Sequence, residues 1–388
     1  MGLAIAYNLA QLGLTRVVVL EASYIASGAS GRNGGGLRQQ WSTEMNIRLM
    51  QESIEICSHF AQRMRINVWM RRGGYLFLIR TAATLAQIEL NIALQNRCDV
   101  PTRLIEPDDA RAIVPELEVA GLVAASYNPT DAVVFPWPFL WGYARAATAL
   151  GVVIHSATPV TGIERSGSSD FVVQTPRGQI TAGRIINAAG AWSPQVARTV
   201  GLHLPNWPAR HEILSTEPLK PFLKPMVSVL ESGLYFSQSL RGELVGGITM
   251  PEPEPETETE TETKTKTKTA PSHHPPQIEL GSRLAFLRAM AAGMTEIMPR
   301  LGHVKVVRQW AGPYDMTPDG NPIVGEAPGV PGFFLCCGFM GHGFMMAPVV
   351  ARYYALHLTG QQTHPFLHQW RLARFAEGDV ERENMIIG

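Results

Sequence analysis

The sequence predicts a mixed α/β fold, because patterns typical of helices and of buried strands follow one another three times along the chain. Residues 2–13 carry apolar side chains at helical spacing, and the β-branched run at 16–20 is typical of a parallel-sheet strand buried on both faces. A similar succession returns at 136–193, and residues 332–360 add a strand, a glycine-rich loop and a helix. We therefore expect an α/β unit built on a parallel sheet.

The segments between these units show other patterns. Residues 42–64 predict a helix with a Ser/Thr cap, and residues 73–135 predict short strands and turns with a helix near Pro107–Ile113. From about 206 to 311 the alternation of side chains predicts an antiparallel sheet with one solvated face. The low-complexity stretch 251–276 has no apolar face to bury, so we expect a disordered insertion, with a hairpin as the alternative.

The first 21 residues match the second half of a dinucleotide-binding βαβ unit. Gly2 stands at the third glycine of the G-x-G-x-x-G motif, where backbone amides and the helix dipole hold a pyrophosphate. Glu21 stands where an acidic side chain accepts the ribose hydroxyl. On this interpretation the first strand and two glycines have been lost upstream. The alternative is an ordinary amphipathic helix followed by a strand and a surface glutamate.

Composition excludes several classes of protein. Lys plus Arg and Asp plus Glu number 33 each, so no bulk charge indicates a nucleic-acid partner. No basic residue precedes Arg16, and Asn8 and Gln11 interrupt the apolar stretch, which argues against a signal peptide and a membrane span. The four cysteines lack CxxC spacing, so we expect reduced thiols in a cytoplasmic protein and no metal site.

Several stretches, in a fixed order, carry a resemblance to a known family. They are GLAIAYNLAQLGLTRVVVLE (2–21), GASGRNGGGLRQQW (28–41), IINAAGAWS (185–193), and RQWAGPYDMTPDGNPIVG (308–325) with GFMGHGFMMAP (338–348). The chain resembles the D-amino-acid-oxidase-like family of FAD-dependent amine oxidoreductases. Within it, the chain is most similar to the sarcosine oxidase beta-subunit branch and its dehydrogenase relatives.

The resemblance implies two interleaved domains. One is a Rossmann-like FAD-binding domain of the glutathione reductase type, here without its first strand, formed by residues 1–60, 137–205 and 320–388. The other is an α+β substrate domain with an antiparallel sheet, formed by residues 61–136 and 206–319.

The resemblance also implies how the chain holds FAD. The glycines at 28–36 let the backbone approach the cofactor closely, although a flexible surface loop is the alternative. The loop before Phe344 would point a helix N-terminus at the flavin pyrimidine edge, where amides stabilise negative charge. Val160 is equally suited to core packing. The implied cofactor contacts are Gly2, Glu21, Ser30, Arg32, Asn33, Gly34, Gly35, Val160, Ala189, Gly190, Trp192, Gly338, Gly341, His342, Gly343, Phe344 and Met345.

Three residues are implied to act on the substrate. Arg38 would hold a carboxylate with its guanidinium fork, unless it serves a structural salt bridge. His342 would be a general base or a donor to the flavin, unless it only packs in its loop. Tyr235 would cover the flavin face, with cross-strand packing as the alternative.

Three departures from the family's patterns refine this expectation. The stretch at 310–319 lacks the cysteine that carries covalent FAD in monomeric sarcosine oxidases, so FAD should be non-covalent. No histidine occurs at 128–137, where heterotetrameric sarcosine oxidases attach FMN. Leu244 and Met345 occupy positions where some oxidases carry lysines, which favours a dehydrogenase over an oxidase.

The implied function is FAD-dependent oxidation of the C–N bond of a small amino acid or N-alkyl amino acid of the sarcosine, proline or glycine type. A hydride would pass from the carbon next to nitrogen to flavin N5, and the imine would hydrolyse in water. One alternative is a D-amino-acid or glycine oxidase-like enzyme that uses oxygen. Another is an inactive truncated fragment or scaffold subunit. The implied partners are the substrate, an electron acceptor or oxygen, and subunits of a hetero-oligomer.

Overall fold

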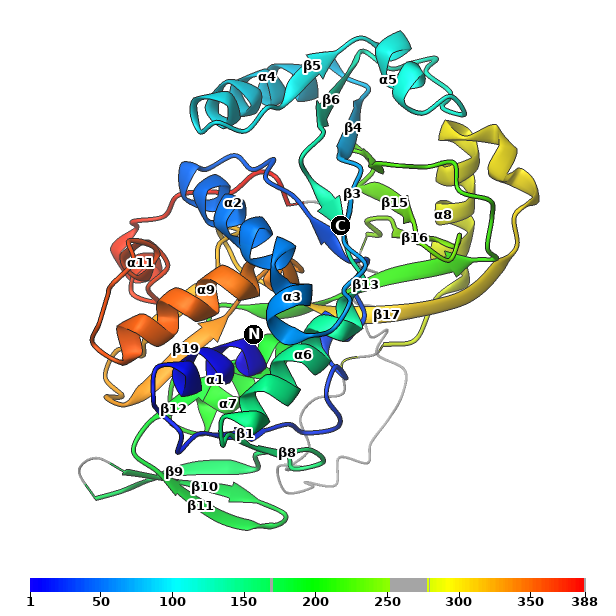
Figure 1. The fold of residues 1–388 in the computed structure, drawn as a ribbon. Coiled ribbons are helices and arrows are strands. Elements are labelled where there is room, and N and C mark those ends of the chain that lie inside the picture. The colour runs from blue at the N-terminus through cyan, green and yellow to red at the C-terminus, as the bar shows by residue number, and fades with distance from the viewer. Residues whose placement is uncertain (168–169, 252–277, 279, 387–388) are drawn as a thin grey trace, which may run out of the picture.

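The largest part of the fold is a mixed sheet of eight strands (Figure 1). The computed structural model describes residues 1–167, 170–251, 278 and 280–386. Neighbouring strands run antiparallel except for β14 and β4, so the predicted antiparallel sheet is present with one parallel junction. The prediction that one face is solvated was wrong for these central strands, because every residue of β14 and β4 is buried. The strand order is β17 (Val306–Met316), β13 (Trp207–Thr216), β16 (Leu244–Gly247), β15 (Leu234–Gln238), β14 (Met226–Val229), β4 (Tyr75–Ile79), β6 (Ala124–Asn128) and β5 (Arg103–Ile105).

The predicted parallel sheet consists of two short pieces. Strand β1 (Val18–Leu20) pairs in parallel with β8 (Val153–His155), and β12 (Ile185–Asn187) pairs in parallel with β19 (Phe333–Cys337). Strand β18 (Ile323–Glu326) adds to β19 in the antiparallel direction. The prediction that the run at 16–20 is buried on both faces was wrong, because β8 is the one strand that pairs with β1 among the described residues. As a result Val18 is 44% exposed.

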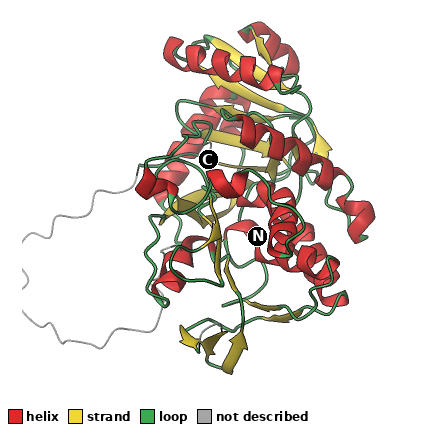
Figure 2. Ribbon diagram, turned by 90° about the vertical axis from the view of Figure 1, so that its left-hand side faces the viewer, coloured by secondary structure: helices red, strands yellow, loops and turns green. Residues whose placement is uncertain are grey.

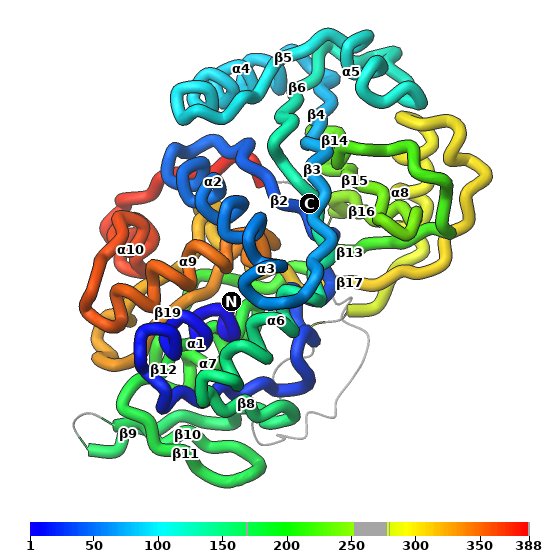
Figure 3. Tube along the Cα trace, viewed as in Figure 1, coloured from blue at the N-terminus to red at the C-terminus, as the bar shows by residue number. Residues whose placement is uncertain are grey.

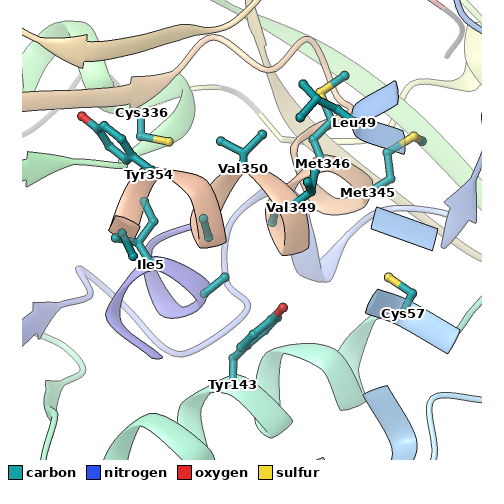
Figure 4. Packing of buried hydrophobic residues seen from close by; sticks show 14 of the residues in the cluster. Ile5, Leu49, Cys57, Tyr143, Cys336, Met345, Met346, Val349, Val350 and Tyr354 are labelled. Carbon is teal, nitrogen blue, oxygen red and sulfur yellow. The ribbon is translucent and has the colours of Figure 1, made fainter. Parts of the chain in front are cut away.

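A helical layer forms the core beside these parallel strands. The N-terminal helix α1 lies against α9 from the C-terminal part of the chain, and α2 and α6 complete the layer (Figure 3). Ile5 of α1, Tyr143 of α6 and Val350 of α9 converge in one hydrophobic cluster (Figure 4). This packing fixes the N-terminus of α9 relative to the sheet. The bounds are α1 (Gly2–Gln11), α2 (Glu44–Ser58), α6 (Pro136–Ala149) and α9 (Gly343–Leu358).

Three helix predictions need correction. The 73–135 segment contains a second helix, α4 (Ala82–Arg97), which was missed because its buried face mixes isoleucines with Asn91 and Gln95. Helix α8 (Leu284–Ile297) interrupts the region predicted as a sheet. The helix predicted at 42–64 breaks at His59 into α2 and the short α3 (Phe60–Met64). Residues 252–276 of the predicted insertion lie outside the described residues.

Helices α4 and α5 lie beside the β5–β6 end of the large sheet, at the top of Figure 1. The same end is at the top of Figure 2. Smaller elements complete the molecule. No helix in the described part of the chain has the length and apolar character needed to cross a membrane. The remaining elements are β2 (Gly36–Leu37), β3 (Arg71–Arg72), β7 (Ala132–Val133), β9 (Gly162–Ser166), β10 (Asp170–Thr175), β11 (Gly178–Ala182), α5 (Pro107–Ile113), α7 (Ser193–Arg198), α10 (Phe366–Gln369), α11 (Arg374–Glu377), and the 3-10 turns η1 (Ala29–Gly31), η2 (Gly190–Trp192) and η3 (Pro299–His303).

Candidate active site

A cleft lies between one face of the eight-stranded sheet and two loops, one after η1 and one before α9. It encloses about 750 Å³ free of protein atoms, its open mouth included. Two arginines are the charged groups among the residues that line it, and neither an acidic residue nor a lysine belongs to the lining. The lining residues are Ala29, Arg32, Asn33, Gly34, Gly35, Gly36, Arg38, Tyr75, His211, Ile213, Met226, Ser228, Tyr235, Gly312, Tyr314, Gly341, His342, Phe344 and Met345.

The sheet wall of the cleft is built from alternate residues of five strands. Side chains two apart on a strand share a face, which places Met226 with Ser228 on β14 and His211 with Ile213 on β13. Gly312 and Tyr314 on β17, Tyr235 on β15 and Tyr75 on β4 contribute the remaining residues of this wall. Cross-strand pairing sets their register, with Ser228 opposite Tyr235, His211 opposite Gly312, and Met226 opposite Tyr75.

Three of these residues form a hydrogen-bonded aromatic group. His211 Nε2 lies 3.0 Å from the Tyr235 hydroxyl, and the His211 ring stacks on Tyr314 with centroids 4.5 Å apart. The phenols of Tyr235 and Tyr314 lie close enough to influence each other's pKa. Burial lowers the pKa of His211 to about 4 and raises the pKa of both tyrosines, so all three groups are uncharged near neutral pH. The group can therefore exchange hydrogen bonds with a ligand without adding charge to the cleft.

The loop after η1 lies opposite this wall and approaches it with main-chain atoms rather than side chains. A Cβ atom on Gly36 would lie 1.7 Å from the Tyr75 hydroxyl oxygen, and one on Gly35 would lie 1.9 Å from the Val134 carbonyl oxygen. Asn33 Oδ1 accepts a hydrogen bond from the Gly35 amide at 2.7 Å, which holds the turn. Only glycine permits this approach, as the glycine density of the sequence indicated.

Arg32 secures the same loop. Its Nε donates to the Ser27 carbonyl at 3.0 Å, and its Nη1 donates to the Ala311 carbonyl on β17 at 2.9 Å. Trp310 Nε1 in turn donates to the Arg32 carbonyl at 2.8 Å. Arg32 therefore ties the loop to the sheet and also places a positive charge at the cleft.

The second loop leads into α9 and is braced by β17. Gly341 has φ +81° and lies against the Tyr314 ring, where a Cβ atom would come within 2.3 Å of a ring carbon. The buried Asp315 carboxylate accepts hydrogen bonds from the Gly338 amide and from Asn206. Helix α9 then begins at Gly343 with no side-chain cap, so its first amides have no partner within the helix. These amides and the helix dipole form an electropositive end beside the cleft.

Arg38 and His342 meet beneath this loop. Arg38 is 2% exposed, its Cζ lies 3.9 Å from the centroid of the Trp41 ring, and its Nη2 lies 3.2 Å from His342 Nε2. The guanidinium also donates to the carbonyls of Gln40 and Met385. Arg38 lines the cleft, but protein acceptors hold much of its donor capacity, and its role toward a carboxylate stays a prediction.

The other predicted cofactor residues lie along the adjoining edge of the parallel strands. A Cβ atom on Gly2 would lie 3.7 Å from the Ala188 Cβ, so the N-terminus of α1 approaches the end of β12. Glu21 follows β1, and its carboxylate accepts hydrogen bonds from the Ser23 amide and the Ser27 hydroxyl. Val160 is partly buried in a hydrophobic cluster. Six further predicted residues do not belong to the cleft lining, and they are Ser30 in η1, Ala189 before η2, Gly190 and Trp192 in η2, Gly338 after β19, and Gly343 at the start of α9.

A comparison with protein families decides what this arrangement belongs to. The model of the DAO family, FAD dependent oxidoreductase, matches residues 1–356. The chain belongs to this family. FAD is therefore its cofactor, and the close-approach glycines and the uncapped end of α9 fit a large anionic dinucleotide.

Several proteins of similar sequence or structure are named as oxidases or dehydrogenases of amino acids. The chain is 28% identical to sarcosine oxidase subunit beta of Rhodobacter capsulatus, over all of this chain and 89% of that protein. It is 27% identical to rat mitochondrial dimethylglycine dehydrogenase, over 91% of this chain but only 41% of that longer protein. The solved structure of L-proline dehydrogenase from P. horikoshii superposes with a TM-score of 0.87 at 31% identity, over 98% of this chain and 96% of that one.

Sequence reasoning missed four polar side chains of this DAO-family cleft, together with apolar and glycine residues of the same lining such as Ile213, Met226 and Gly312. Tyr75, His211, Ser228 and Tyr314 come from four strands and meet only through the sheet register. Each also fits an alternating strand pattern, which identifies the face but not its purpose. The polar residues on that otherwise buried face were the available signal.

Proposed function

We propose that this chain oxidises the C–N bond of a small N-alkyl amino acid of the sarcosine, dimethylglycine or proline type. The names of its relatives support this substrate class. The observation that carries the proposal is the cleft itself, in which an uncharged His–Tyr–Tyr group faces two arginines without a carboxylate among the lining residues. Bound FAD supplies the two-electron oxidant for this reaction.

The charges of the cleft favour a substrate with an anionic end and a neutral amine. Arg38 attracts a carboxylate, whereas no acidic side chain of the lining would pair with an ammonium group. The positive surroundings lower the pKa of a bound amine and so favour its unprotonated form, which has the lone pair that oxidation needs. The Tyr235 hydroxyl, held by His211, is available to hydrogen-bond that nitrogen. An N-alkyl group would contact Met226, Ile213 and Phe344.

The residues proposed to hold FAD form a continuous path. The N-terminus of α1 and Glu21 would bind the pyrophosphate and ribose, the turns after β12 and at η1 would follow, and the amides of α9 would meet the pyrimidine edge of the ring system. Binding is proposed to be non-covalent, because the four cysteines are buried outside the cleft lining.

The electron acceptor is proposed to be a molecule other than oxygen. Met345 lines the cleft and offers no positive charge to superoxide. The expectation that Leu244 stands beside the flavin was wrong, because Leu244 is packed in a separate core cluster outside the cleft lining, so its identity does not bear on the acceptor. We also propose that the chain assembles with other subunits, as the name of the sarcosine oxidase subunit suggests. Its four free, buried cysteines suit the reducing cytoplasm.

A spectroscopic titration tests the activity. The purified protein should carry flavin absorbance that bleaches anaerobically with sarcosine, dimethylglycine or L-proline, and that recovers faster with an artificial dye than with air. Peroxide release at the rate of dye reduction would favour the oxygen-using oxidase instead. A colourless protein that takes up no FAD would refute the proposal and favour a scaffold role.

A further inference from the structure

The Tyr75 hydroxyl is a polar group of the cleft that no residue of the described chain engages, and the Oγ atom of Ser228 on the neighbouring strand is another. Tyr75 is 5% exposed and lines the cleft from β4. Its hydroxyl has no hydrogen-bond partner among the described residues, although buried hydroxyls ordinarily have one. Because Tyr75 lines the cleft, its hydroxyl is available to a ligand bound there, and the chain itself does not compete for this donor.

The surroundings of this hydroxyl favour an anionic partner. Burial raises the pKa of Tyr75, so the group keeps its proton and is a hydrogen-bond donor at every physiological pH. The positive charge of Arg38 acts on the same phenol, as does the buried carboxyl group of Asp131, but Asp131 does not belong to the cleft lining and no other acidic side chain does. A buried donor beside a guanidinium is the arrangement that binds a carboxylate.

The sheet separates this donor from the His–Tyr–Tyr group. Tyr75 on β4 and Tyr235 on β15 flank β14, and both reach the glycine loop, Tyr75 at Gly36 and Tyr235 at Gly34. Neighbouring strands lie about 4.8 Å apart, so the two phenols approach the cleft from opposite sides of Met226 and Ser228. The two ends of one small amino acid can therefore meet different phenols.

We propose that the Tyr75 hydroxyl donates a hydrogen bond to the substrate carboxylate beside Arg38, and so orients the substrate with its amine toward Tyr235. This inference rests on the proposed function for the substrate class. Tyr75 would then be a further specificity residue. Its hydroxyl would supply a hydrogen bond that Arg38 cannot, because the Arg38 guanidinium already donates to the carbonyls of Gln40 and Met385.

Ligand binding to the oxidised holoenzyme tests the inference apart from turnover. The probes are pyrrole-2-carboxylate and pyrrole, which differ only in the carboxylate, and the readout is the perturbation of flavin absorbance. Tyr75→Phe should weaken binding of pyrrole-2-carboxylate by about 10- to 100-fold, the loss typical of a hydrogen bond to a charged group, and should leave pyrrole unchanged. The matched control is Tyr127→Phe on the neighbouring strand β6, because the Tyr127 hydroxyl donates to the Gly73 carbonyl instead.

Equal weakening of both probes, or an unchanged affinity for both, would overturn the inference. If Tyr75→Phe loses flavin, Tyr75→Leu provides a second variant without the hydroxyl. The ratio of its affinities for pyrrole-2-carboxylate and for pyrrole is then compared with the same ratio for the wild type. The binding assay can be read whether or not any amino acid is oxidised. A wild-type protein that binds pyrrole-2-carboxylate but is not bleached by amino acids would refute the proposed reaction and leave the carboxylate site intact.

Discussion

The Tyr314 ring lies so close to Gly341 that a Cβ atom on this glycine would come within 2.3 Å of a ring carbon. Tyr314 stands on β17 of the large sheet, and Gly341 precedes α9 of the helical layer. This contact therefore joins the two halves of the cleft and sets the distance between the sheet wall and the α9 amides. Several consequences of this geometry can be measured.

Replacing Gly341 with alanine should separate these halves. The new Cβ would overlap the Tyr314 ring, and the residue would keep a φ of +81° that non-glycine residues rarely adopt. We expect a loss of bound FAD and a loss of at least about 2 kcal/mol in unfolding free energy. The control is Gly360→Ala, which shares a positive φ of +72° but has open space at the Cβ position. Similar flavin content in both variants would contradict the prediction.

Replacing Tyr235 with phenylalanine should slow the reaction without releasing FAD. The variant removes the hydroxyl that is hydrogen-bonded to His211, while the ring keeps its packing. Because this hydroxyl is proposed to hydrogen-bond the substrate nitrogen, and one such bond contributes about 1 kcal/mol, we expect kcat to fall by about 10-fold. The flavin spectrum of the oxidised protein and the melting temperature should change little. Tyr353→Phe, which removes a hydroxyl bonded to Glu52, serves as a control and should retain full activity.

The pH dependence of stability should reveal the buried imidazole of His211. Its pKa falls from the ordinary 6.5 to about 4 in the folded protein, so the unfolded chain binds the proton more tightly. Folding stability should therefore decrease as pH falls from about 6.5 to about 4, by up to about 3 kcal/mol. Urea unfolding at pH 7.5 and pH 4.5 should show a smaller decrease for His211→Gln than for the wild type. An identical decrease in both proteins would show that other groups cause it.

A buried ion pair should anchor the C-terminal segment. The Arg374 guanidinium donates to both oxygens of Asp319 at 2.8 and 3.0 Å, and both side chains are almost fully buried. Arg374→Leu would leave the Asp319 carboxylate buried and unpaired, which typically costs about 3–5 kcal/mol in unfolding free energy. Arg371→Leu breaks an exposed pair with Glu377 and Asp379 and should change the urea midpoint little. Equal midpoints for the two variants would argue against the anchor.

The sequence allowed the glycine-rich side of the cleft to be predicted but not the opposite wall. Gly35, Gly341 and the start of α9 were recognisable because a close backbone approach needs consecutive small residues at one place in the chain. Tyr75 and His211 were not recognisable, since they are 136 positions apart and are placed on one face of the sheet by pairing through three intervening strands. Register of this kind depends on the whole sheet rather than on a local pattern.

Secondary structure showed the same division between local and non-local causes. Helix α5 was predicted at its observed bounds because Pro107 begins it and two aspartates occupy its first turn. Strand β1 has the composition of a buried strand, yet its exposure is decided by which strands lie beside it. Helix α8 was missed because it follows the low-complexity stretch inside a region of alternating strands.

Because the substrate-facing wall draws one or two side chains from each of several strands, its chemistry can be altered a residue at a time. The opposite side of the cleft, which is proposed to bind FAD, consists of backbone and glycine residues in close contact with the sheet, so it tolerates substitution far less. Related enzymes can therefore change their substrate specificity while the FAD site stays the same. Laboratory selection for activity on new amines should begin at Met226, Ser228 and Ile213.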